Sequence, residues 1–415
     1  MTSVSDYRVV GFFSALFGGV LVFLGSIALL FLTCMLLAAL LQRLHLPPLL
    51  GMLLAGILLG PSVLNLLDDG LLAISGSLRK IALLIILARA GLTLRRSDLK
   101  KVGRPALLMC FVPALCELAA VTLLGPYFLD ISRLEAAILG SVLAAVSPAV
   151  VVPQMLRLME EGWGTERCVP QLILAGASMD DIVVIVLFTA FTGLAQGSGV
   201  SGWQLAAVPV SVVTGLAGGM LAGLVLTLLL RRWKPEGLRL CLVFLSVAFL
   251  LAALEDWGVV PFSGLLAVMA AANLLQQRQP EAGDALQRQL SQLWVPAQML
   301  LFALVGAAVD LHYAGQMGAG MLALLGLALL CRMLGVALCL RRTPLRPKER
   351  LFCMIAYLPK ATVQAAVGGV PLAMGLACGQ LVLTGAVAAI LLTAPLGAIG
   401  MACTYRHLLT QDTSV

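Results

Sequence analysis

Two adjacent aspartates, Asp180 and Asp181, lie in the middle of an apolar stretch that runs from Leu172 to Leu194. A carboxylate inside a membrane-spanning segment is costly unless water, a counter-charge or a proton compensates it, and such residues mark ion pathways and proton relays. Na⁺ and Li⁺ prefer oxygen ligands, and a desolvated carboxyl group holds either such a cation or a proton. We therefore expect Asp180 and Asp181 to bind a transported metal cation and protons in turn. A structural ion-pair site is the alternative.

Three further charged residues, Glu117, Arg332 and Lys360, also fall inside apolar stretches. Intramembrane ionisable residues usually face the bundle interior and pair with one another. We interpret Glu117 and Arg332 as a structural ion pair near the aspartates. Two interpretations of Lys360 stay open. Its ammonium group either pairs with Asp180 or Asp181 in the proton-loaded state or is a fixed counter-charge for exposed backbone carbonyls.

Two proline-containing segments lie within the apolar stretches, S-P-A-V-V-V-P at 147–153 and L-P-K-A-T-V-Q at 358–364. Proline removes a backbone donor and clashes with the preceding turn. Half-helix ends exposed inside a membrane bind ions where they line a cavity. We therefore expect two discontinuous helices, with Gln364 as a nearby neutral polar group. The residues expected at the two breaks are Ser147, Pro148, Pro153, Pro359 and Thr362.

The composition of the chain indicates the elements that position these residues. Of 415 residues, 61% are hydrophobic and only 11% are charged, whereas about a quarter of the residues in soluble domains are charged. Apolar stretches of about 20 residues, enough to span a bilayer, recur from end to end. The sequence therefore predicts an all-α polytopic membrane protein, a single transmembrane domain over residues 1–415.

The polar breaks divide the chain into about thirteen transmembrane helices, and a fourteenth within residues 9–41 is left open. The expected spans are 19–42, 47–60, 73–92, 105–126, 134–158, 170–195, 203–230, 238–255, 258–276, 291–310, 318–340, 350–374 and 380–403.

Basic residues gather in the loops 95–104, 231–239 and 341–350, which fall on one side of the membrane in this count. Arg79 and Lys80 are the main exception. Because cytoplasmic loops are enriched in Lys and Arg, the N-terminus is expected outside and the C-terminus in the cytoplasm. The same rule accounts for the net charge of +7, so nucleic acid is not an expected partner.

An odd number of spans divides into two six-helix repeats of inverted topology, a common construction in secondary transporters. The first repeat would cover residues 19–195 and the second 238–403, with 203–230 as the linker helix. The charges support this division, because 31 residues separate Glu117 from Pro148 and 27 separate Arg332 from Pro359.

Several motifs make the chain resemble the cation:proton antiporter superfamily, specifically its NHA branch of sodium/proton exchangers. The motifs are S-P-A-V-V-V-P (147–153), A-G-A-S-M-D-D-I (175–182), F-A-L-V-G-A-A-V-D (302–310), Y-L-P-K-A-T-V-Q-A-A (357–366) and L-P-P-L-L-G-M-L-L-A-G (46–56). The resemblance implies an NhaA-like antiporter fold, with a dimerisation domain and a six-helix core in which two discontinuous helices cross. It also implies a homodimer and elevator-like transport.

The resemblance assigns a role to each buried charge. Asp181 would be the primary ion-binding and proton-carrying carboxylate, with Asp180 as its partner. Glu117 and Arg332 would correspond to the buried ion pair of the branch, and Lys360 to its crossing-helix lysine.

We therefore expect an antiporter that exchanges Na⁺ or Li⁺ for protons without a cofactor. We expect it in a cell membrane, namely the inner membrane of a bacterium. A K⁺/H⁺ antiporter, a sodium-coupled symporter of an organic anion and a non-transporting sensor or channel subunit are the alternatives. An enzyme is not expected, because no nucleophile–base pair, metal-ligand set or phosphate-binding loop is present in the sequence.

Overall fold

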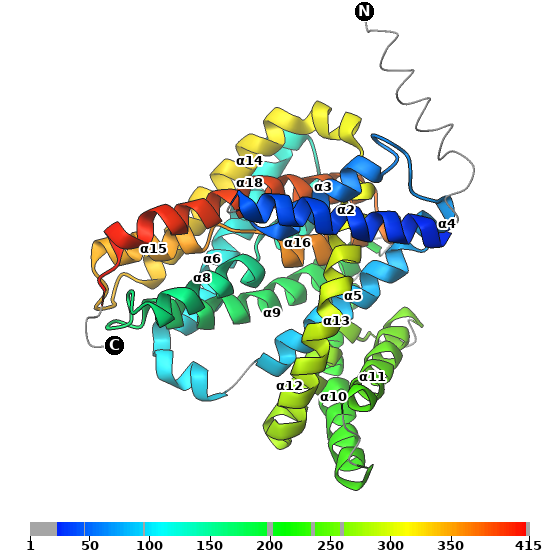
Figure 1. Cartoon of the computed structure of the whole chain (residues 1–415), viewed down its shortest axis with the longest axis horizontal. Coiled ribbons are helices and arrows are strands. Elements are labelled where there is room, and N and C mark those ends of the chain that lie inside the picture. The colour runs from blue at the N-terminus through cyan, green and yellow to red at the C-terminus, as the bar shows by residue number, and fades with distance from the viewer. Residues whose placement is uncertain are drawn as a thin grey trace, which may run out of the picture.

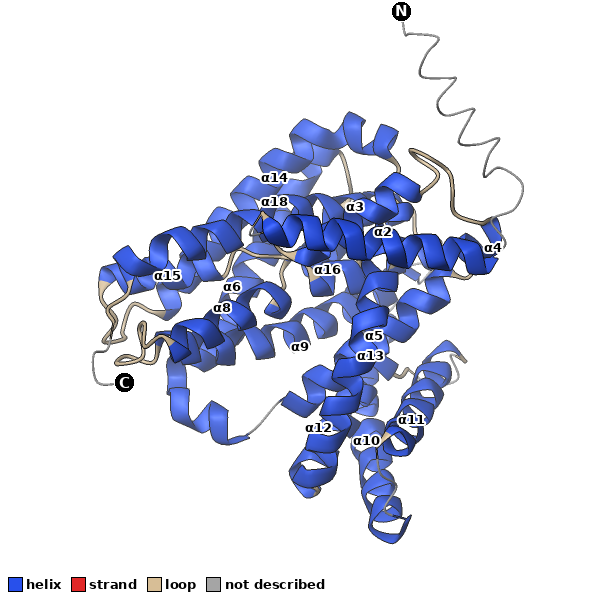
Figure 2. Cartoon of the chain, viewed as in Figure 1, coloured by secondary structure: helices blue, strands red, loops and turns tan. Residues whose placement is uncertain are grey.

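The computed structural model describes residues 23–44, 46–93, 96–196, 202–233, 237–257 and 261–411. Within these ranges the regular structure is helical, and the one β-bridge joins Trp163 to Gln411 (Figure 2). The all-helical architecture expected from the composition is thus confirmed. The fourteenth helix left open near the N-terminus would involve residues before Phe23, which lie outside the described ranges.

The helices are numbered in chain order, and most of them are labelled in Figure 1. They are α2 (Phe23–Arg43), α3 (Pro48–Leu59), α4 (Asp69–Ala73), α5 (Ser75–Thr93), α6 (Arg96–Leu129), α7 (Arg133–Leu143), α8 (Pro148–Glu160), α9 (Val169–Gln196), α10 (Gly202–Trp233), α11 (Leu238–Asp256), α12 (Gly264–Arg278), α13 (Pro280–Ala307), α14 (Leu311–Cys339), α15 (Pro347–Ala356), α16 (Thr362–Val367), α17 (Val370–Ala373) and α18 (Gly379–Leu408).

Eight helical segments among the described residues are long and apolar enough to cross a membrane. This supports a polytopic membrane protein, although the number is lower than the expected thirteen. Some expected spans are short helices in the structure. The 12 residues of α3, for example, reach only about 18 Å at 1.5 Å per residue, which is less than the ~30 Å hydrocarbon thickness.

The helix bounds differ from the expected spans where polar or proline residues occur. The span expected at 291–310 begins earlier, at Pro280, because a proline at the first helical position and Glu281 in the first turn favour a helix start there. The span expected at 350–374 is divided into α15, α16 and α17. Hydropathy alone detects neither feature.

The helices that carry the buried charges pack around one another. Helix α6 packs against α7, α9 and α14, and α18 packs against α7, α8, α15 and α16. In a second group of helices, α10 packs against α12, and α13 packs against α3 and α5. Figure 1 shows α10, α11 and α12 at the lower right, away from α14, α15 and α18. Helices α5 and α13 also contact α16 and so join the two groups.

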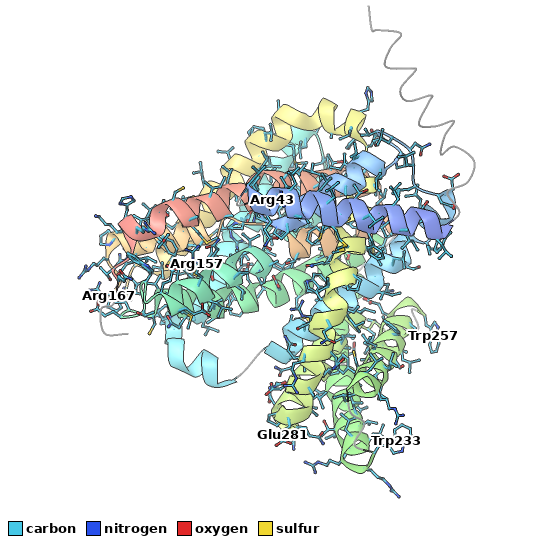
Figure 3. All side chains as sticks on the ribbon, viewed as in Figure 1. Arg43, Arg157, Arg167, Trp233, Trp257 and Glu281 are labelled. Carbon is cyan, nitrogen blue, oxygen red and sulfur yellow. The ribbon has the colours of Figure 1, made fainter. Side chains whose placement is uncertain are left out.

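Three segments that are distant in sequence meet at one end of the molecule. The backbone N–H of Gly164 donates to the carbonyl of Thr410 at 2.8 Å, and Arg167 Nη1 donates to the carbonyl of Pro344 at 3.1 Å. Arg167 is labelled at this end in Figure 3. These contacts place three segments at one end of the molecule, namely loop 161–168, the loop before α15 and the C-terminal segment. The thirteen-span count likewise puts these segments on one side of the membrane.

Candidate functional site

Two helix breaks bring non-helical backbone together in the interior. The first lies between α7, which ends at Leu143, and α8, which begins at Pro148, with Ser147 as the N-cap of α8. The second lies between α15, which ends at Ala356, and α16, which begins at Thr362. The two breaks are joined directly, because the N–H of Ser147 donates to the carbonyl of Pro359 at 2.8 Å.

The three prolines predicted at the breaks have different positions. Pro148 occupies the first turn of α8, where its missing N–H has no intrahelical partner to lose. Pro153 lies inside α8, and Pro359 lies in the second break.

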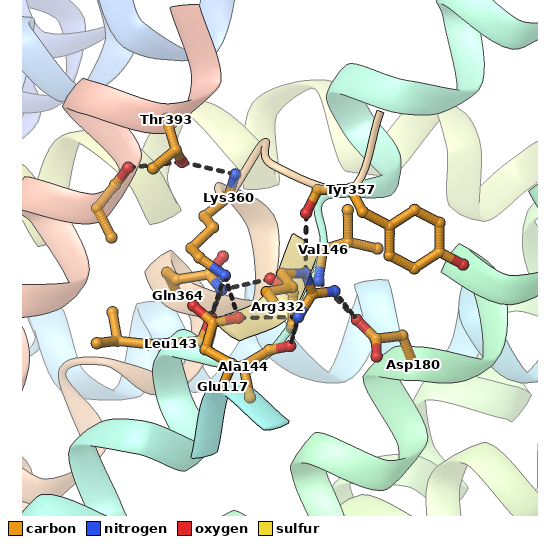
Figure 4. Close-up of polar contacts among 12 residues, drawn as sticks. Glu117, Leu143, Ala144, Val146, Asp180, Arg332, Tyr357, Lys360, Gln364 and Thr393 are labelled. Carbon is orange, nitrogen blue, oxygen red and sulfur yellow. Dashed lines mark hydrogen bonds and ion pairs between the residues drawn. The ribbon is translucent and has the colours of Figure 1, made fainter. Parts of the chain in front are cut away.

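Arg332 of α14 is fully buried and lies at the centre of the site (Figure 4). Its Nη1 is 2.9 Å from Glu117 Oε2, and its Nη2 is 2.8 Å from Asp180 Oδ2. Its Nε donates to the carbonyl of Tyr357 at 2.8 Å, and Nη1 also donates to the carbonyl of Ala144. One guanidinium group therefore connects α6, α9 and both breaks.

Lys360 lies in the second break and is also fully buried. Its Nζ is 2.8 Å from Glu117 Oε2 and 2.5 Å from the carbonyl of Leu143 at the end of α7. Its backbone N–H donates to Thr393 Oγ1 of α18 at 2.9 Å. In this structure Lys360 therefore contacts Glu117, and its pairing with Asp180 or Asp181 in the proton-loaded state stays a prediction.

Asp180 and Asp181 have different surroundings although they are neighbours on α9. Asp180 is fully buried, and its Oδ2 accepts hydrogen bonds from Arg332 and, at 2.8 Å, from the N–H of Val146. Asp181 is 8% exposed, and its buried Oδ1 has no hydrogen-bond partner within the described ranges. Successive helical residues differ by about 100° in direction, which explains why Arg332 forms an ion pair with Asp180 and none with Asp181 among the described residues.

Five of the buried charged residues form one group, which we call the charge cluster: Glu117, Asp180, Asp181, Arg332 and Lys360. Three are carboxylates and two are cations, so the cluster carries a net charge of −1 when all five are ionised. Arg332 and Lys360 both contact Glu117, and Arg332 contacts Asp180. Asp181 is the carboxylate of the cluster that no cation contacts among the described residues.

Neutral polar side chains complete the interior. Gln364 Nε2 donates to the carbonyls of Val142 and Ala145 at 3.1 and 3.0 Å, and so it satisfies backbone acceptors that the end of α7 leaves without partners. The hydroxyl oxygens of Ser147 and Thr362 are buried without a hydrogen-bond partner in the part of the chain that the structure describes.

The sequence did not identify two residues that hold the cluster in place. The ring of Tyr357 lies under Arg332, with the guanidinium carbon 5.5 Å from the ring centroid. Thr393 accepts from the backbone of Lys360. Tyr357 lies directly before the L-P-K motif, and this position was the available signal. Thr393 carries no local signal, because its partner is 33 residues away in the chain.

Gly176, one turn before Asp180 on α9, gives Tyr357 its space. A Cβ atom at Gly176 would lie 1.9 Å from the Tyr357 hydroxyl oxygen, so no larger side chain fits without moving the tyrosine.

Comparison with known proteins identifies relatives of this chain. A family model described as sodium/hydrogen exchanger, transmembrane, matches residues 11–404. Sodium/hydrogen exchanger 9B2 of Mus musculus is 35% identical over 376 residues, covering 85% of this chain and 67% of that protein. The Homo sapiens protein of the same name is also 35% identical over 376 residues, covering 85% of this chain and 68% of its own length.

The chain is also similar to a solved structure, that of the sodium proton antiporter MjNhaP1 from Methanocaldococcus jannaschii. The TM-score is 0.79 at 21% sequence identity, and the match covers 93% of this chain and 98% of that one. At this identity the likeness shows the fold.

Proposed function

The chain belongs to the sodium/hydrogen exchanger family, and from that membership we propose that it is a secondary active antiporter of Na⁺ or Li⁺ and protons. In this proposal, Asp180 and Asp181 form the transport site and are exposed alternately to the two sides of the membrane. The observation that best supports this proposal is that the two aspartates have different contacts. Asp180 is bound by Arg332 and Val146, whereas Asp181 has no cation in contact within the described residues.

The charge balance explains why the site would couple two flows. With all five groups ionised, the charge cluster lacks one positive charge, and no cation of the described residues contacts Asp181. A buried carboxylate needs compensation by a counter-charge or by protonation. One Na⁺, one Li⁺ or one proton meets this need equally well. Occupancy by a cation would therefore exclude the proton, and each would be carried across in turn.

The same balance leads us to propose one-for-one, electroneutral exchange. Moving a second proton per cycle would require another group of the cluster to release one when the cation binds. Lys360 is the candidate for such a release, but its ammonium group donates to Glu117 and to the carbonyl of Leu143. Both acceptors favour the charged form of the lysine, so we propose that Lys360 is a fixed counter-charge.

The helix breaks and the packing of the helices around them suggest how the site is exposed to each side of the membrane in turn. We propose that the helices around the charge cluster move against the group that contains α3, α10, α12 and α13, and that the two breaks stay joined through Ser147 and Pro359 during this movement. Ser147 and Thr362 would add neutral oxygens to the cation site. We also propose that the protein is a homodimer in the cell membrane, which in a bacterium is the inner membrane. The N-terminus would lie outside and the C-terminus in the cytoplasm.

Transport by purified protein in proteoliposomes tests this function. An imposed pH gradient should drive Na⁺ or Li⁺ exchange in the wild type, and Asp181→Asn should abolish it. Selective transport of K⁺ would replace the sodium proposal with a K⁺/H⁺ antiporter. Uptake of an organic anion together with Na⁺, without proton countertransport, would contradict antiport altogether.

A further inference from the structure

A cavity of about 370 Å³ opens between α8 and α18, apart from the charge cluster. We call it the arginine cavity, and its lining includes Gln154, Arg157, Leu158, Met401, Tyr405 and Arg406. It lies at the end of the molecule where loop 161–168 meets the C-terminal segment, because Trp163 packs edge-on against Tyr405 with ring centroids 5.3 Å apart. Figure 3 labels Arg157 in this region.

The two arginines that line the cavity are each held through the Nε atom. Arg157 Nε donates to Glu161 Oε1 at 2.6 Å, and Arg406 Nε donates to the Tyr405 hydroxyl at 2.9 Å, with its guanidinium carbon 5.5 Å from the tyrosine ring centroid. Neither arginine forms a hydrogen bond or ion pair through its Nη atoms with another described residue. Two oriented guanidinium groups therefore have their terminal donors available beside one cavity.

These donors define the chemistry of a ligand. Arginine presents a planar set of N–H donors that matches the oxygens of phosphate, and Gln154 adds an amide. Glu161 offsets one of the two positive charges, so the site retains a net charge of +1, which suits a single phosphodiester. Leu158 and Met401 add an apolar wall. A phosphate group attached to an apolar body fits this combination better than a free ion.

We propose that the arginine cavity binds a phosphate group carried by the headgroup of an anionic membrane lipid. Basic pockets between transmembrane helices on the cytoplasmic side bind such headgroups. The same end of the molecule carries further basic residues around the start of α15, among them Arg341, Arg342 and Arg346. This site goes beyond the proposed exchange function, and its occupancy does not depend on transport.

A ligand held by both arginines would join two helices that support the charge cluster. Arg157 lies on α8, which begins at the first break, and Arg406 lies on α18, whose Thr393 holds the backbone of Lys360. Ligands that bind only the folded state stabilise it. Lipid bound here would therefore raise the thermal stability of the helices around the transport site.

The test measures binding on purified, detergent-solubilised full chain, by native mass spectrometry and thermal unfolding. The probes are dioctanoyl phosphatidylglycerol, dioctanoyl phosphatidylcholine and inorganic phosphate. The test variant is Arg157→Gln with Arg406→Gln. The matched control is Arg231→Gln with Arg232→Gln, which removes two exposed arginines from the last turn of α10. A third variant, Arg157→Lys with Arg406→Lys, retains the charge.

We expect the anionic lipid to bind the wild type and raise its melting temperature. Binding should weaken about tenfold or more in the double glutamine variant, because two charge-assisted hydrogen-bonding groups are lost. The α10 control should bind like the wild type, and the lysine variant should bind with intermediate affinity. If inorganic phosphate alone raises the wild-type melting temperature and the anionic lipid does not, the lipid assignment is wrong. Equal lipid binding by the wild type and the double glutamine variant would overturn the site itself.

Discussion

The ammonium group of Lys360 lies 2.8 Å from Oε2 of Glu117, the same oxygen that Arg332 Nη1 approaches to 2.9 Å. One carboxylate of α6 therefore holds two cations that come from α14 and from the second helix break. Because Lys360 is directed to Glu117, the aspartates of α9 are left with Arg332 as their basic contact among the described residues, and that contact is made by Asp180. This arrangement determines the expected behaviour of each variant below.

Replacing Lys360 with alanine tests whether this lysine carries a proton. We expect exchange to be slower, since Glu117 loses one of its two cations, but the voltage dependence should stay that of the wild type. The measurement is cation-driven proton flux in proteoliposomes at zero and at an imposed membrane potential. A voltage dependence that appears or disappears in Lys360→Ala would show that the lysine takes part in proton transfer.

Replacing Glu117 with alanine leaves two buried cations without their shared carboxylate. Breaking a buried ion pair by removing one partner costs about 3–5 kcal/mol, so we expect the melting temperature to fall on the order of 10 °C. The control is Glu161→Ala, which removes an exposed i,i+4 pair with Arg157 that contributes about 0–1 kcal/mol. Apparent melting temperatures in detergent provide the comparison. A Glu117→Ala protein as stable as this control, with weakened cation affinity, would assign Glu117 to the transport site.

Asp180 and Asp181 should respond differently to the same change. Asp181→Asn removes a carboxylate that has no basic partner in the described part of the chain. We therefore expect a folded protein, near wild-type in melting temperature, that has no exchange activity. Asp180→Asn removes a contact of Arg332 and should lower both stability and exchange. Melting temperature and transport are measured for both variants. The two roles would be reversed if Asp181→Asn retained full exchange activity. They would also be reversed if Asp180→Asn had normal stability while Asp181→Asn was unfolded.

Adding one methyl group to α9 tests how Tyr357 positions Arg332. Gly176→Ala would place its Cβ 1.9 Å from the Tyr357 hydroxyl oxygen. Such overpacking costs about 1–3 kcal/mol, and displacement of the tyrosine should slow exchange. Gly193→Ala makes the same change on the same helix, at a position where no described atom outside its own stretch of helix lies within 4 Å of the new Cβ. This variant should behave as the wild type. Equal transport rates in the two variants would exclude Tyr357 from the positioning of Arg332.

Several parts of the site could be predicted from the sequence because charge is rare in this chain. Asp180 and Asp181 are conspicuous within an apolar segment, and so are Glu117 and Arg332, which were predicted to pair and lie 2.9 Å apart. Pro148 begins α8 directly after the first break, and Pro359 lies in the non-helical backbone of the second break. The resemblance to cation:proton antiporters is confirmed by the family match and the relatives. All these features depend on residue type and local pattern.

The choice of partners could not be predicted, because it depends on distances between residues far apart in the chain. Lys360 and Glu117 are 243 positions apart, and no sequence feature distinguishes Glu117 from the aspartates as the acceptor. The difference between Asp180 and Asp181 depends on which way each points around α9. The inverted repeats 19–195 and 238–403 stay a prediction. Helix starts such as Pro280 were misplaced because hydropathy detects apolar length and not capping.

Proton release on cation binding tests the central claim most directly, that one carboxylate site holds either a metal cation or a proton. Purified protein in weakly buffered detergent solution is titrated with Na⁺ while the pH is recorded. We expect about one proton to be released for each Na⁺ bound by the wild type, and no release from Asp181→Asn. Binding of Na⁺ by the wild type without proton release, or equal release by Asp181→Asn, would contradict this account.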